Sequence, residues 1–572
     1  MRMTSRTFTK DTMTRGPRAL LPLLFGIATS LAAQAPLPLK RAPRPTTSAI
    51  TAGDLMTRLY LISDDSMKGR RAGSPEHQKT TAYIASELER FGLQPAGDSG
   101  GYFQSVPLVS RHFDTGTTLT AGSAALRQDS DFVPLIVRGS PRSIDGAPII
   151  YGGVFTDSTS WISAEQARGK FVVFDTPAGN GSHFFTINIR PTSRFASAAG
   201  VAVPTLDYAP AFYLARIHRP GLALATSATG AESEAPLHVL LTAAAARTLF
   251  PKPLDSLTAG TLGDTIHGSV HLVEEARPTR NVIAVLPGSD PALKGEYVAI
   301  GAHSDHIGTS DVPLDHDSVR AVNEAAWEMR GKSLDNAAPG EPQRATIHAN
   351  VDSLHKLHAP RVDSVFNGAD DDGSGTVSVL EIAQKFASER PRPKRSILFV
   401  WHTGEELGLL GSRWFTDHPT VPRDSIVTQF NIDMIGRGSA QDILGGGPAF
   451  LQLIGSRRLS TELGDLVEKV NRTQEHPPFH FDYSLDRAGH PENIYCRSDH
   501  YMYARYGIPI TFFTTGLHED YHQLTDEAEY IDYAHMARIA TFVHDVALTV
   551  ANLDHRVVVD QPKPDPKGVC RQ

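Results

Sequence analysis

Residues 367–375 read Asn-Gly-Ala-Asp-Asp-Asp-Gly-Ser-Gly, with three consecutive acids between flexible glycines. Directly behind them, Val379, Ile382, Ala383 and Phe386 repeat at helical spacing. A loop that leads into a helix in this way can hold a carboxylate rigidly at the mouth of a fold. Asp, Gly, Ser and Asn also make ordinary turns. The motifs that accompany this loop therefore decide between the two interpretations.

The composition is typical of a globular protein with a sizeable core. Of the 572 residues, 40% are hydrophobic and 21% are charged, and this length predicts two or three domains. The net charge is −8, and no dense tract of Lys and Arg is present. We therefore expect no nucleic-acid partner.

The amino end has the pattern of a secretory signal. Basic residues between Arg2 and Arg18 precede an apolar run, residues 19–33, which closes on small residues. At about 15 residues this run is short for a membrane span, and no later stretch of 18 apolar residues follows. We expect residues 1–33 to be a signal peptide and residues 34–47 a linker. The mature protein would then be secreted or periplasmic, with no membrane partner after removal of the signal.

The rest of the chain predicts an α/β fold with an inserted β-rich domain. After Arg280, near-continuous apolar runs alternate with helical segments, which is typical of a mostly parallel mixed sheet covered by helices. The expected strands are residues 282–286, 297–300, 396–401, 427–432 and 508–513. Between 141 and 274, short apolar runs are separated by Gly, Ser, Thr and Pro, which predicts a small, mostly β module. The catalytic domain would then comprise residues 48–140 and 275–555.

Smaller segments complete this organisation. Ser74-Pro75 predicts the start of a helix, and Gly92 its end. Residues 311–366 are polar, with a helix expected over 321–329, and are interpreted as a lid-like excursion. Residues 556–572 are expected to form a loose tail. Only Cys496 and Cys570 occur, so the fold cannot depend on a framework of disulfides.

Acids and histidines follow the expected strands where each of them ends. In open α/β sheets, sites form outside the carboxyl ends of the strands. Each such residue also has an ordinary explanation, as a structural histidine or a solvated carboxylate, and the site fails only if all of these explanations hold together. A mixed set of this kind suits zinc. The residues are His303 and Asp305, Glu405 and Glu406, Asp433, and His522, joined by Asp371 of the opening loop.

Charge balance favours two metal ions. Two Zn²⁺ carry four positive charges, and three carboxylates with a bridging hydroxide would neutralise them. The carboxylates are Asp371, Glu406 and Asp433. Asp305, two residues from His303, and Asp526, four residues from His522, are expected to support the two histidines from behind.

These motifs resemble the bacterial leucyl aminopeptidase family of co-catalytic zinc exopeptidases, whose relatives include glutamate carboxypeptidase, transferrin receptor and glutaminyl cyclase. The resemblance spans about residues 67–550 and rests on five motifs in the same order. They are His303-Ser-Asp305, the 367–375 loop, Gly404-Glu-Glu406, Asn431-Ile-Asp-Met-Ile-Gly436 and Tyr521-His522. Residues 141–274 resemble the protease-associated domain found in many of these relatives.

The resemblance implies a role for each position. Asp371 would bridge two zinc ions, with His303 and Asp433 on one ion and Glu406 and His522 on the other. Glu405 would be the general base. Adjacent side chains of an extended segment point opposite ways, which would let one glutamate bind metal while its neighbour faces the water.

The direction of attack is the most open question. An aminopeptidase acting on peptides with a free amino terminus is the leading hypothesis. A carboxypeptidase or dipeptidase on the same scaffold, a receptor-like binding protein and a cyclase are the alternatives. Carboxylate capture would need Arg, and only Arg437 and Arg497 lie near the expected rim. A surplus of acids that are not assigned as metal ligands would instead attract an ammonium group. These acids are Asp370, Asp372, Glu405, Glu519 and Asp520.

Overall fold

A computed structural model describes residues 42–135, 141–176, 194–209, 220–225, 235–330, 351–356, 359–474 and 476–572, together with residues 347 and 349. The expected signal peptide lies outside the described residues. No helix within these ranges is both long enough and apolar enough to cross a bilayer.

The largest sheet of the described residues is mixed, with a parallel centre. Its strands run in the order β1-β14-β18-β15-β19-β22-β20-β21, with β2 also paired to β14. The central neighbours β18, β15, β19 and β22 are parallel, whereas β14 and β20 join antiparallel on either side. The expected strands and the fold class are confirmed. The bounds are β1 Gln94–Pro95, β2 Phe103–Val106, β14 Thr279–Leu286, β15 Tyr297–His303, β18 Ser396–His402, β19 Ile426–Ile432, β20 Phe450–Ile454, β21 His480–Asp482 and β22 Ile510–Thr514.

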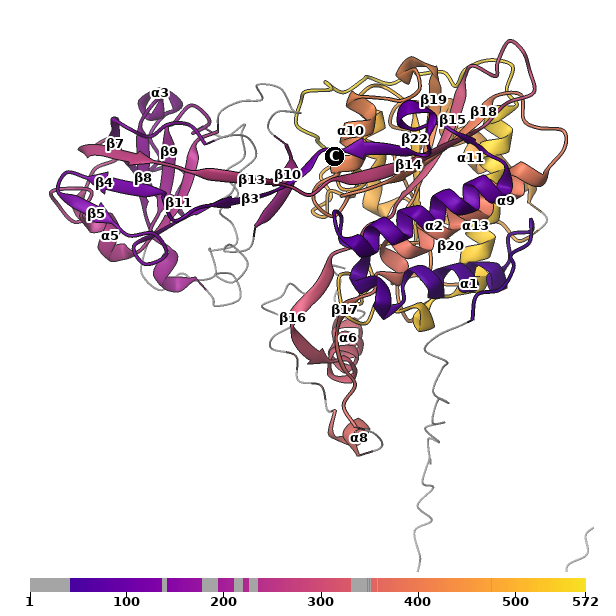
Figure 1. The fold of residues 1–572 in the computed structure, drawn as a ribbon, viewed down its shortest axis with the longest axis horizontal. Helices are drawn as coiled ribbons and strands as arrows, with labels where there is room; N and C mark the ends of the chain where they lie inside the picture. Colours follow the sequence, from indigo (N-terminus) through magenta and orange to yellow (C-terminus); the bar gives the residue numbers. More distant parts are fainter. Residues whose placement is uncertain are drawn as a thin grey trace, which may run out of the picture. The chain divides into compact units, whose positions relative to one another are not determined.

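Helices cover both faces of this sheet (Figure 1). Alternate residues of β18 point to opposite sides: Phe399 and Trp401 enter one hydrophobic cluster, and Leu398 and Val400 enter another. The first cluster lies against α1, α2, α9 and α13, and the second includes residues of α10 and α12. The bounds are α1 Ala52–Ile62, α2 Pro75–Phe91, α9 Gly375–Ser388, α10 Leu410–Asp417, α11 Thr461–Thr473, α12 His500–Ala504 and α13 Tyr533–Ala551.

Helix α9 follows the opening acidic loop and is buried on nearly every side. Val379, Leu380, Ile382 and Phe386 are fully buried, because α9 packs against α1, α2, α13 and the sheet. A helix that is apolar all round belongs in a core, and each of these side chains contributes about 1.5–3 kcal/mol by burial. The loop in front of α9 is therefore attached to a helix that is packed into the hydrophobic core.

The inserted domain contains its own sheet and hydrophobic clusters. Its strands run in the order β5-β4-β12-β7-β8-β9-β11-β6. Three of them lie before residue 141, so the sheet begins earlier than the sequence predicts. Runs of three or four residues carry too little periodicity to reveal their distant partners; β4, for example, pairs with β12. The bounds are β4 Thr118–Ala121, β5 Ala124–Leu126, β6 Phe132–Leu135, β7 Ala147–Val154, α3 Ala164–Ala167, β8 Phe171–Asp175, β9 Gly200–Val203, β11 Leu237–Leu241, α5 Ala243–Arg247 and β12 Leu262–Ser269.

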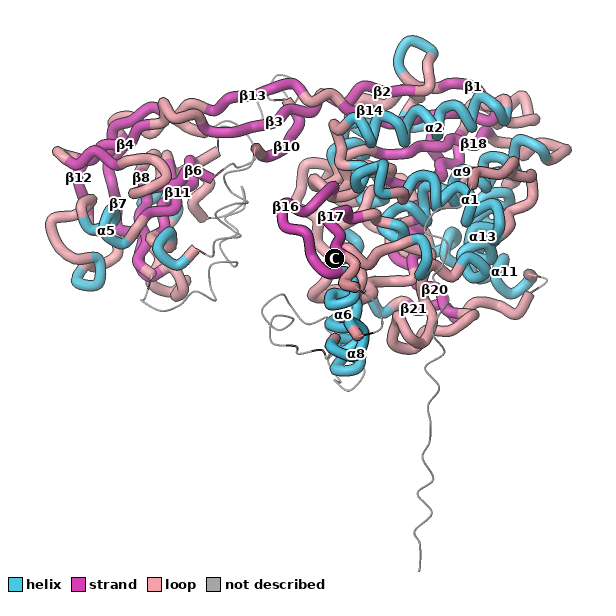
Figure 2. Tube along the Cα trace, turned by 60° about the horizontal axis from the view of Figure 1, so that its bottom comes forward, coloured by secondary structure: helices cyan, strands magenta, loops and turns pink. Residues whose placement is uncertain are grey.

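Two small sheets complete the described chain. β3 (Leu108–Phe113) pairs with β10 (Gly221–Leu224) and β13 (Leu272–Ala276). Within the expected lid, β16 (Gly308–Asp315) pairs antiparallel with β17 (Val362–Phe366) and leads into α6, as Figure 2 shows. The helices of this excursion are α6 (His316–Arg330) and α8 (Asp352–His355).

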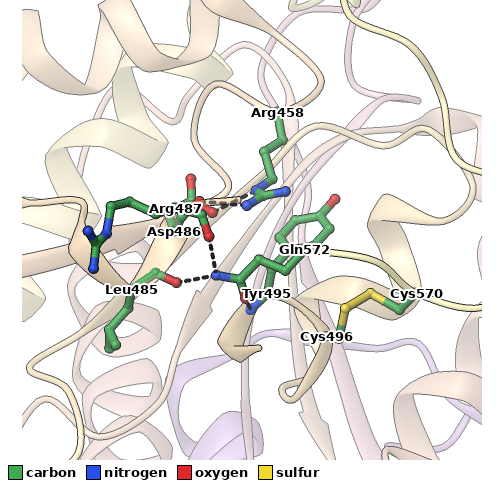
Figure 3. Close-up of a disulfide and its surroundings, with 8 residues drawn as sticks. All are labelled: Arg458, Leu485, Asp486, Arg487, Tyr495, Cys496, Cys570 and Gln572. Atoms are coloured by element: carbon green, nitrogen blue, oxygen red, sulfur yellow. Dashed lines mark hydrogen bonds and ion pairs between the residues drawn. A yellow bond between two sulfur atoms is a disulfide. The ribbon is translucent and has the colours of Figure 1, made fainter. Parts of the chain in front are cut away.

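The expectation of a loose tail is wrong. Cys570 forms a disulfide with Cys496, across a separation of 74 residues. The side chain of Gln572 donates hydrogen bonds to the carbonyls of Leu485 and Arg487 and accepts one from the backbone of Tyr495 (Figure 3). Pro-rich composition predicts irregular backbone, but it does not reveal a covalent link to a distant loop.

Candidate metal centre

Side chains of the expected site follow each of the parallel strands. β15 ends in one of them, β18, β19 and β22 lead into others, and the turn Ala369–Ser374 ahead of α9 supplies a further one. Because these strands are parallel neighbours, their carboxyl ends meet at one edge of the sheet. The residues placed there are His303, Asp371, Glu405, Glu406, Asp433 and His522.

Asp371 lies between two groups of potential ligands. Its Oδ1 is 3.2 Å from Nε2 of His303, and its Oδ2 is 3.0 Å from Nε2 of His522. Oδ1 of Asp433 lies 3.7 Å from the same nitrogen of His303, and Oε2 of Glu406 lies 3.0 Å from that of His522. The atoms offered within each group are all within 4.8 Å of one another. The residues expected to bind metal are thus brought together in two groups that share Asp371.

We call His303, Asp371 and Asp433 the first group, and Asp371, Glu406 and His522 the second group. A further histidine, which the sequence analysis did not assign, joins the second group. Nδ1 of His306 lies 2.7 Å from Oε1 of Glu406 and 3.8 Å from Oδ2 of Asp371. The sequence does contain a signal for it, since His306 follows His303 by three residues just past the same strand.

The chemistry of this donor set suits a bound cation. Buried nitrogen and carboxylate oxygen atoms of both groups lack a hydrogen-bond partner of acceptable geometry among the described residues. Leaving such atoms buried without a partner is costly, and imidazole with carboxylate is a donor set that zinc accepts. The atoms are Nε2 of His303, both ring nitrogens of His306, Oδ2 of Asp371, Oε1 of Glu406, Oδ1 of Asp433 and Nε2 of His522.

The loop that carries Asp371 is fixed by buried charged groups. The carboxylate of Asp526 accepts hydrogen bonds from the backbone N–H groups of Asp370 and Asp371, at 2.9 and 3.0 Å. The guanidinium of Arg70 donates to the carbonyls of Asn367 and Gly368, at 2.6 and 2.8 Å. Asp526 was expected to support His522, but its carboxylate binds the backbone of Asp371 instead.

Hydrogen bonds also orient the first group. Nδ1 of His303 lies 3.0 Å from the carbonyl oxygen of Asp305, so this nitrogen can carry the proton and leave Nε2 free for a metal. The hydroxyl of Ser498 donates to Oδ2 of Asp433 at 2.7 Å, which leaves Oδ1 facing His303. Asp305 was expected to support His303 through its carboxylate. The backbone carbonyl makes the closer contact, while Oδ1 of the carboxylate lies 3.8 Å from Nδ1 of His303 and also accepts the N–H of Glu405 at 3.2 Å.

The two adjacent glutamates face different partners, although the segment that carries them is not extended. Backbone N–H groups of Gly408 and Leu409 both donate to the carbonyl of Glu405, so residues 405–409 form a tight turn. Glu406 points to His522, whereas Oε2 of Glu405 lies 4.0 Å from Nε2 of His303. A short turn was not visible in the sequence, but it separates the two carboxylates just as a strand would.

Burial and neighbouring charges shift the titration of these groups. Burial raises the pKa of Glu405 well above its ordinary range, with His303 opposing and Glu406 adding to the effect. Burial also raises the pKa of Asp305 to about 7. Burial acts to lower the pKa of His522, but Asp371 and Glu406 outweigh it and raise that pKa to about 10. A metal ion that binds here therefore replaces protons, so its affinity falls as the pH falls.

The arginines at the rim are already engaged. Arg437 is buried and forms ion pairs with Asp520 at 2.9 Å and Asp442 at 3.1 Å. Arg497 pairs with Glu492 at 2.9 Å and donates to the hydroxyl of Tyr521 at 3.3 Å. The buried Arg437 cannot serve a substrate carboxylate.

The expected surplus of acids is smaller than the sequence predicts. Asp370 pairs with His518 at 3.1 Å, Asp372 accepts the N–H of His303 at 3.0 Å, and Asp520 pairs with Arg437. Internal ion pairs and hydrogen bonds therefore neutralise much of this negative charge. Glu405, which is not assigned as a ligand, faces the candidate metal-binding groups.

Comparison with known proteins points to one peptidase family. Residues 281–547 match the sequence model of Peptidase family M28. The matched range contains every residue of both candidate metal-binding groups, while the β-rich insertion lies outside it.

Several relatives match part of this chain. Leucine aminopeptidase 1 of Paracoccidioides brasiliensis (strain Pb03) is 30% identical over 218 residues, which are 36% of this chain and 52% of that protein. Vacuolar membrane protease of Verticillium alfalfae is 42% identical over 79 residues, 13% of this chain and 8% of that protein. The chain thus spans about half the length of the leucine aminopeptidases that it matches.

Solved structures with a similar fold include two bacterial aminopeptidases. The aminopeptidase from Aneurinibacillus sp. strain AM-1 matches with a TM-score of 0.46 and 17% identity, covering 90% of this chain and 97% of that one. BSAP, a zinc aminopeptidase from Bacillus subtilis, matches with a TM-score of 0.44 and 16% identity, covering 88% and 95%.

Proposed function

We propose that this chain is a zinc-dependent aminopeptidase that removes residues from the free amino end of peptides. The observation that carries the proposal is the placement of Asp371 between two imidazole–carboxylate groups, inside a region that matches the model of peptidase family M28. Asp371 would be shared by two zinc ions, with His303 and Asp433 holding one and Glu406 and His522 holding the other.

Zinc bound in these groups would supply Lewis acidity to polarise a peptide carbonyl and would lower the pKa of a water molecule. The proton chemistry belongs to Glu405. Its carboxylate lies next to His303 rather than among the ligands of the second group. Its pKa, raised by burial, makes it a stronger proton acceptor than an exposed glutamate. Glu405 takes a proton from the attacking water and returns it to the leaving amine nitrogen.

Tyr521 is the second polar group that this chain offers to a substrate. Its ring stacks on His522 with 3.9 Å between ring centroids, and its hydroxyl accepts a hydrogen bond from Arg497. Burial, with Asp371 and Glu406, raises the pKa of Tyr521 far above its ordinary value, so the phenol keeps its proton. Its O–H can therefore donate to the carbonyl oxygen under attack.

The ion pairs of Arg437 and Arg497 support attack at the amino end of the substrate. A carboxypeptidase needs a cation for the terminal carboxylate, yet Arg437 is buried in ion pairs. Arg497 is the rim arginine that remains partly exposed, and it already pairs with Glu492. An amine needs only a carboxylate or a metal ion beside the scissile bond, and the two candidate metal-binding groups would supply both.

The test of the chemistry compares two adjacent glutamates. Glu405→Gln should keep its fold and its zinc but lose about 10²–10⁴ in turnover, the usual value of a positioned proton shuttle. Glu406→Gln is the matched variant and should lose zinc from the second group. Metal analysis and single-turnover rates measure both effects. If Glu405→Gln loses zinc while Glu406→Gln keeps it, the two roles are exchanged.

The test of direction uses one peptide with either end blocked. Amino-terminal acetylation should abolish cleavage, whereas carboxyl-terminal amidation should matter little. If the acetylated peptide is cleaved and the amidated one resists, the carboxypeptidase hypothesis replaces this proposal.

We also propose that the mature chain is exported. The disulfide between Cys496 and Cys570 supports this, because such bonds persist mainly in oxidising compartments. Fractionation of cells that express the full chain tests it: the protein should be found outside the cytoplasm and cleaved near residue 33.

A further inference from the structure

His306 is held in place by its backbone and by its neighbours. Its N–H donates to the carbonyl of Arg70 at 3.3 Å, and its side chain is fully buried. Gly368 lies against the ring, since a Cβ atom there would sit 2.5 Å from Cγ of His306. The imidazole is therefore fixed beside the loop that carries Asp371.

Nδ1 of His306 is directed at two carboxylates of the second group. Nδ1 lies 2.7 Å from Oε1 of Glu406 and 3.8 Å from Oδ2 of Asp371. The ring meets that of His522 edge to face, with 5.6 Å between centroids. Neither ring nitrogen has a hydrogen-bond partner of acceptable geometry among the described residues.

The four donors lie close enough together to share one zinc ion. With metal–ligand distances of about 2.0–2.1 Å, the ligand atoms of a regular tetrahedron lie about 3.3 Å apart. Nδ1 of His306 is 2.7 Å from Oε1 of Glu406 and 3.8 Å from Oδ2 of Asp371, and Nε2 of His522 is 3.0 Å from Oδ2 of Asp371 and 3.0 Å from Oε2 of Glu406. The first group, by contrast, offers His303, Asp371 and Asp433.

We propose that His306 is a fourth protein ligand in the second group, so that the two metal sites are unequal. The inference rests on the proposed zinc peptidase function and deepens it. A site with four protein ligands is closed, as in structural zinc sites, whereas one with three keeps a position for water or substrate. The second group would then bind its ion more tightly and keep it longer, and the first would exchange its ion readily.

The alternative role for His306 is to position Glu406 by donating a hydrogen bond to it. The two roles predict different numbers of imidazole ligands. With His306 bound, the chain supplies three imidazoles to two ions, an average of 1.5 per zinc; without it, the average is 1.0. X-ray absorption at the zinc edge of the wild-type protein measures this number, and no variant has to fold. An average of 1.0 would overturn the proposal.

A variant tests the affinity. Replacing His306 with Gln removes the imidazole but keeps a donor that can reach Glu406. We expect the tighter of the two zinc affinities, measured by competition with a chelator, to fall by about 10–100-fold or more. The visible spectrum of the Co²⁺-loaded protein should change as well. His500→Gln is the control, because His500 is equally buried but stacks on Phe512; both affinities should stay within about threefold.

The outcomes separate this inference from the proposed function. If the wild-type chain binds two zinc ions and cleaves peptides, but His306→Gln changes neither affinity nor spectrum, the function stands and the ligand role of His306 is wrong. A lower affinity with an unchanged Co²⁺ spectrum assigns His306 to positioning and also overturns the inference. A wild-type chain that binds no zinc would overturn both.

Discussion

Replacement of Arg70 by Met should loosen the metal centre from behind, without touching any ligand. Arg70 is 1% exposed, and its guanidinium donates to three buried carbonyls. These belong to Ile62, Asn367 and Gly368, at 3.0, 2.6 and 2.8 Å. The first acceptor ends α1 and the other two begin the loop of Asp371, so one side chain joins the helix to this loop.

The size of the effect follows from these three bonds. Hydrogen bonds from a charged donor contribute about 1.5–3 kcal/mol each, which gives an upper range of about 4–9 kcal/mol. Such terms are not additive, and water can reach part of the vacated space. We therefore expect the free energy of unfolding to fall by about 3–5 kcal/mol, which is the cost of removing one partner from a buried charged interaction. Arg70→Lys should recover little of this loss, because one ammonium group cannot reproduce the planar fork.

Urea unfolding followed by circular dichroism measures the loss, with chelator present so that bound metal does not contribute. Zinc content is measured separately and should also fall in Arg70→Met. The control is Arg90→Met on α2, where a half-exposed arginine pairs with Glu87 three residues earlier; it should cost about 0.5 kcal/mol or less. If Arg70→Met unfolds at the same urea concentration as the wild type and keeps both ions, this account of the loop is wrong.

Two further predictions concern the stability of the catalytic domain. Reduction of the bond between Cys496 and Cys570, or replacement of both by Ser, should lower the free energy of unfolding by about 4 kcal/mol, the chain-entropy value for a separation of 74 residues; equal unfolding midpoints with and without reductant would contradict it. His544 and Glu389 form a partly buried ion pair whose pKa shifts outweigh the effect of burial. Burial acts to lower the pKa of His544, but Asp545 and Glu389 raise it above its ordinary 6.5. Burial acts to raise the pKa of Glu389, but His544 and Lys385 lower it to about 2. This pair therefore stabilises the fold fully between about pH 4.5 and 6.5, and its contribution is lost as the pH falls toward 2 or rises through the folded pKa of His544. Urea midpoints from pH 6 to 9 should fall less steeply in His544→Asn than in the wild type, and parallel curves would refute the assignment.

Much of the fold follows from local patterns in the sequence. The runs at 297–300 and 396–401 are apolar at consecutive positions, because strands buried on both faces have no solvated side. Ser74 and Gly92 begin and end α2 through hydrogen bonds within a few residues of each end. The placement of the candidate metal-binding residues was predictable for a similar reason, since the carboxyl end of a parallel strand is a defined place at one edge of a sheet.

Most of the features that sequence analysis missed depend on pairings between distant residues. The early strands of the insertion become visible only when Thr118–Ala121 pairs with β12. Asp526 is assigned to the backbone of Asp371, 155 residues away, and the tail is fixed through Cys570 and Gln572. His306 enters the second group because the loop of Gly368 folds against it.

The sequence by itself determined which elements form and which of their ends carry chemistry, since strand burial, helix caps and strand-end acids are local properties. The tertiary structure alone decided how the acids are used. Asp520 neutralises Arg437, Asp526 binds backbone N–H groups, and Glu405 is left facing His303. A carboxylate has the same local sequence signal whether it meets a cation, an amide or a substrate. Only the packing of distant segments brings one of these partners within about 3 Å of it, the range over which hydrogen bonds act.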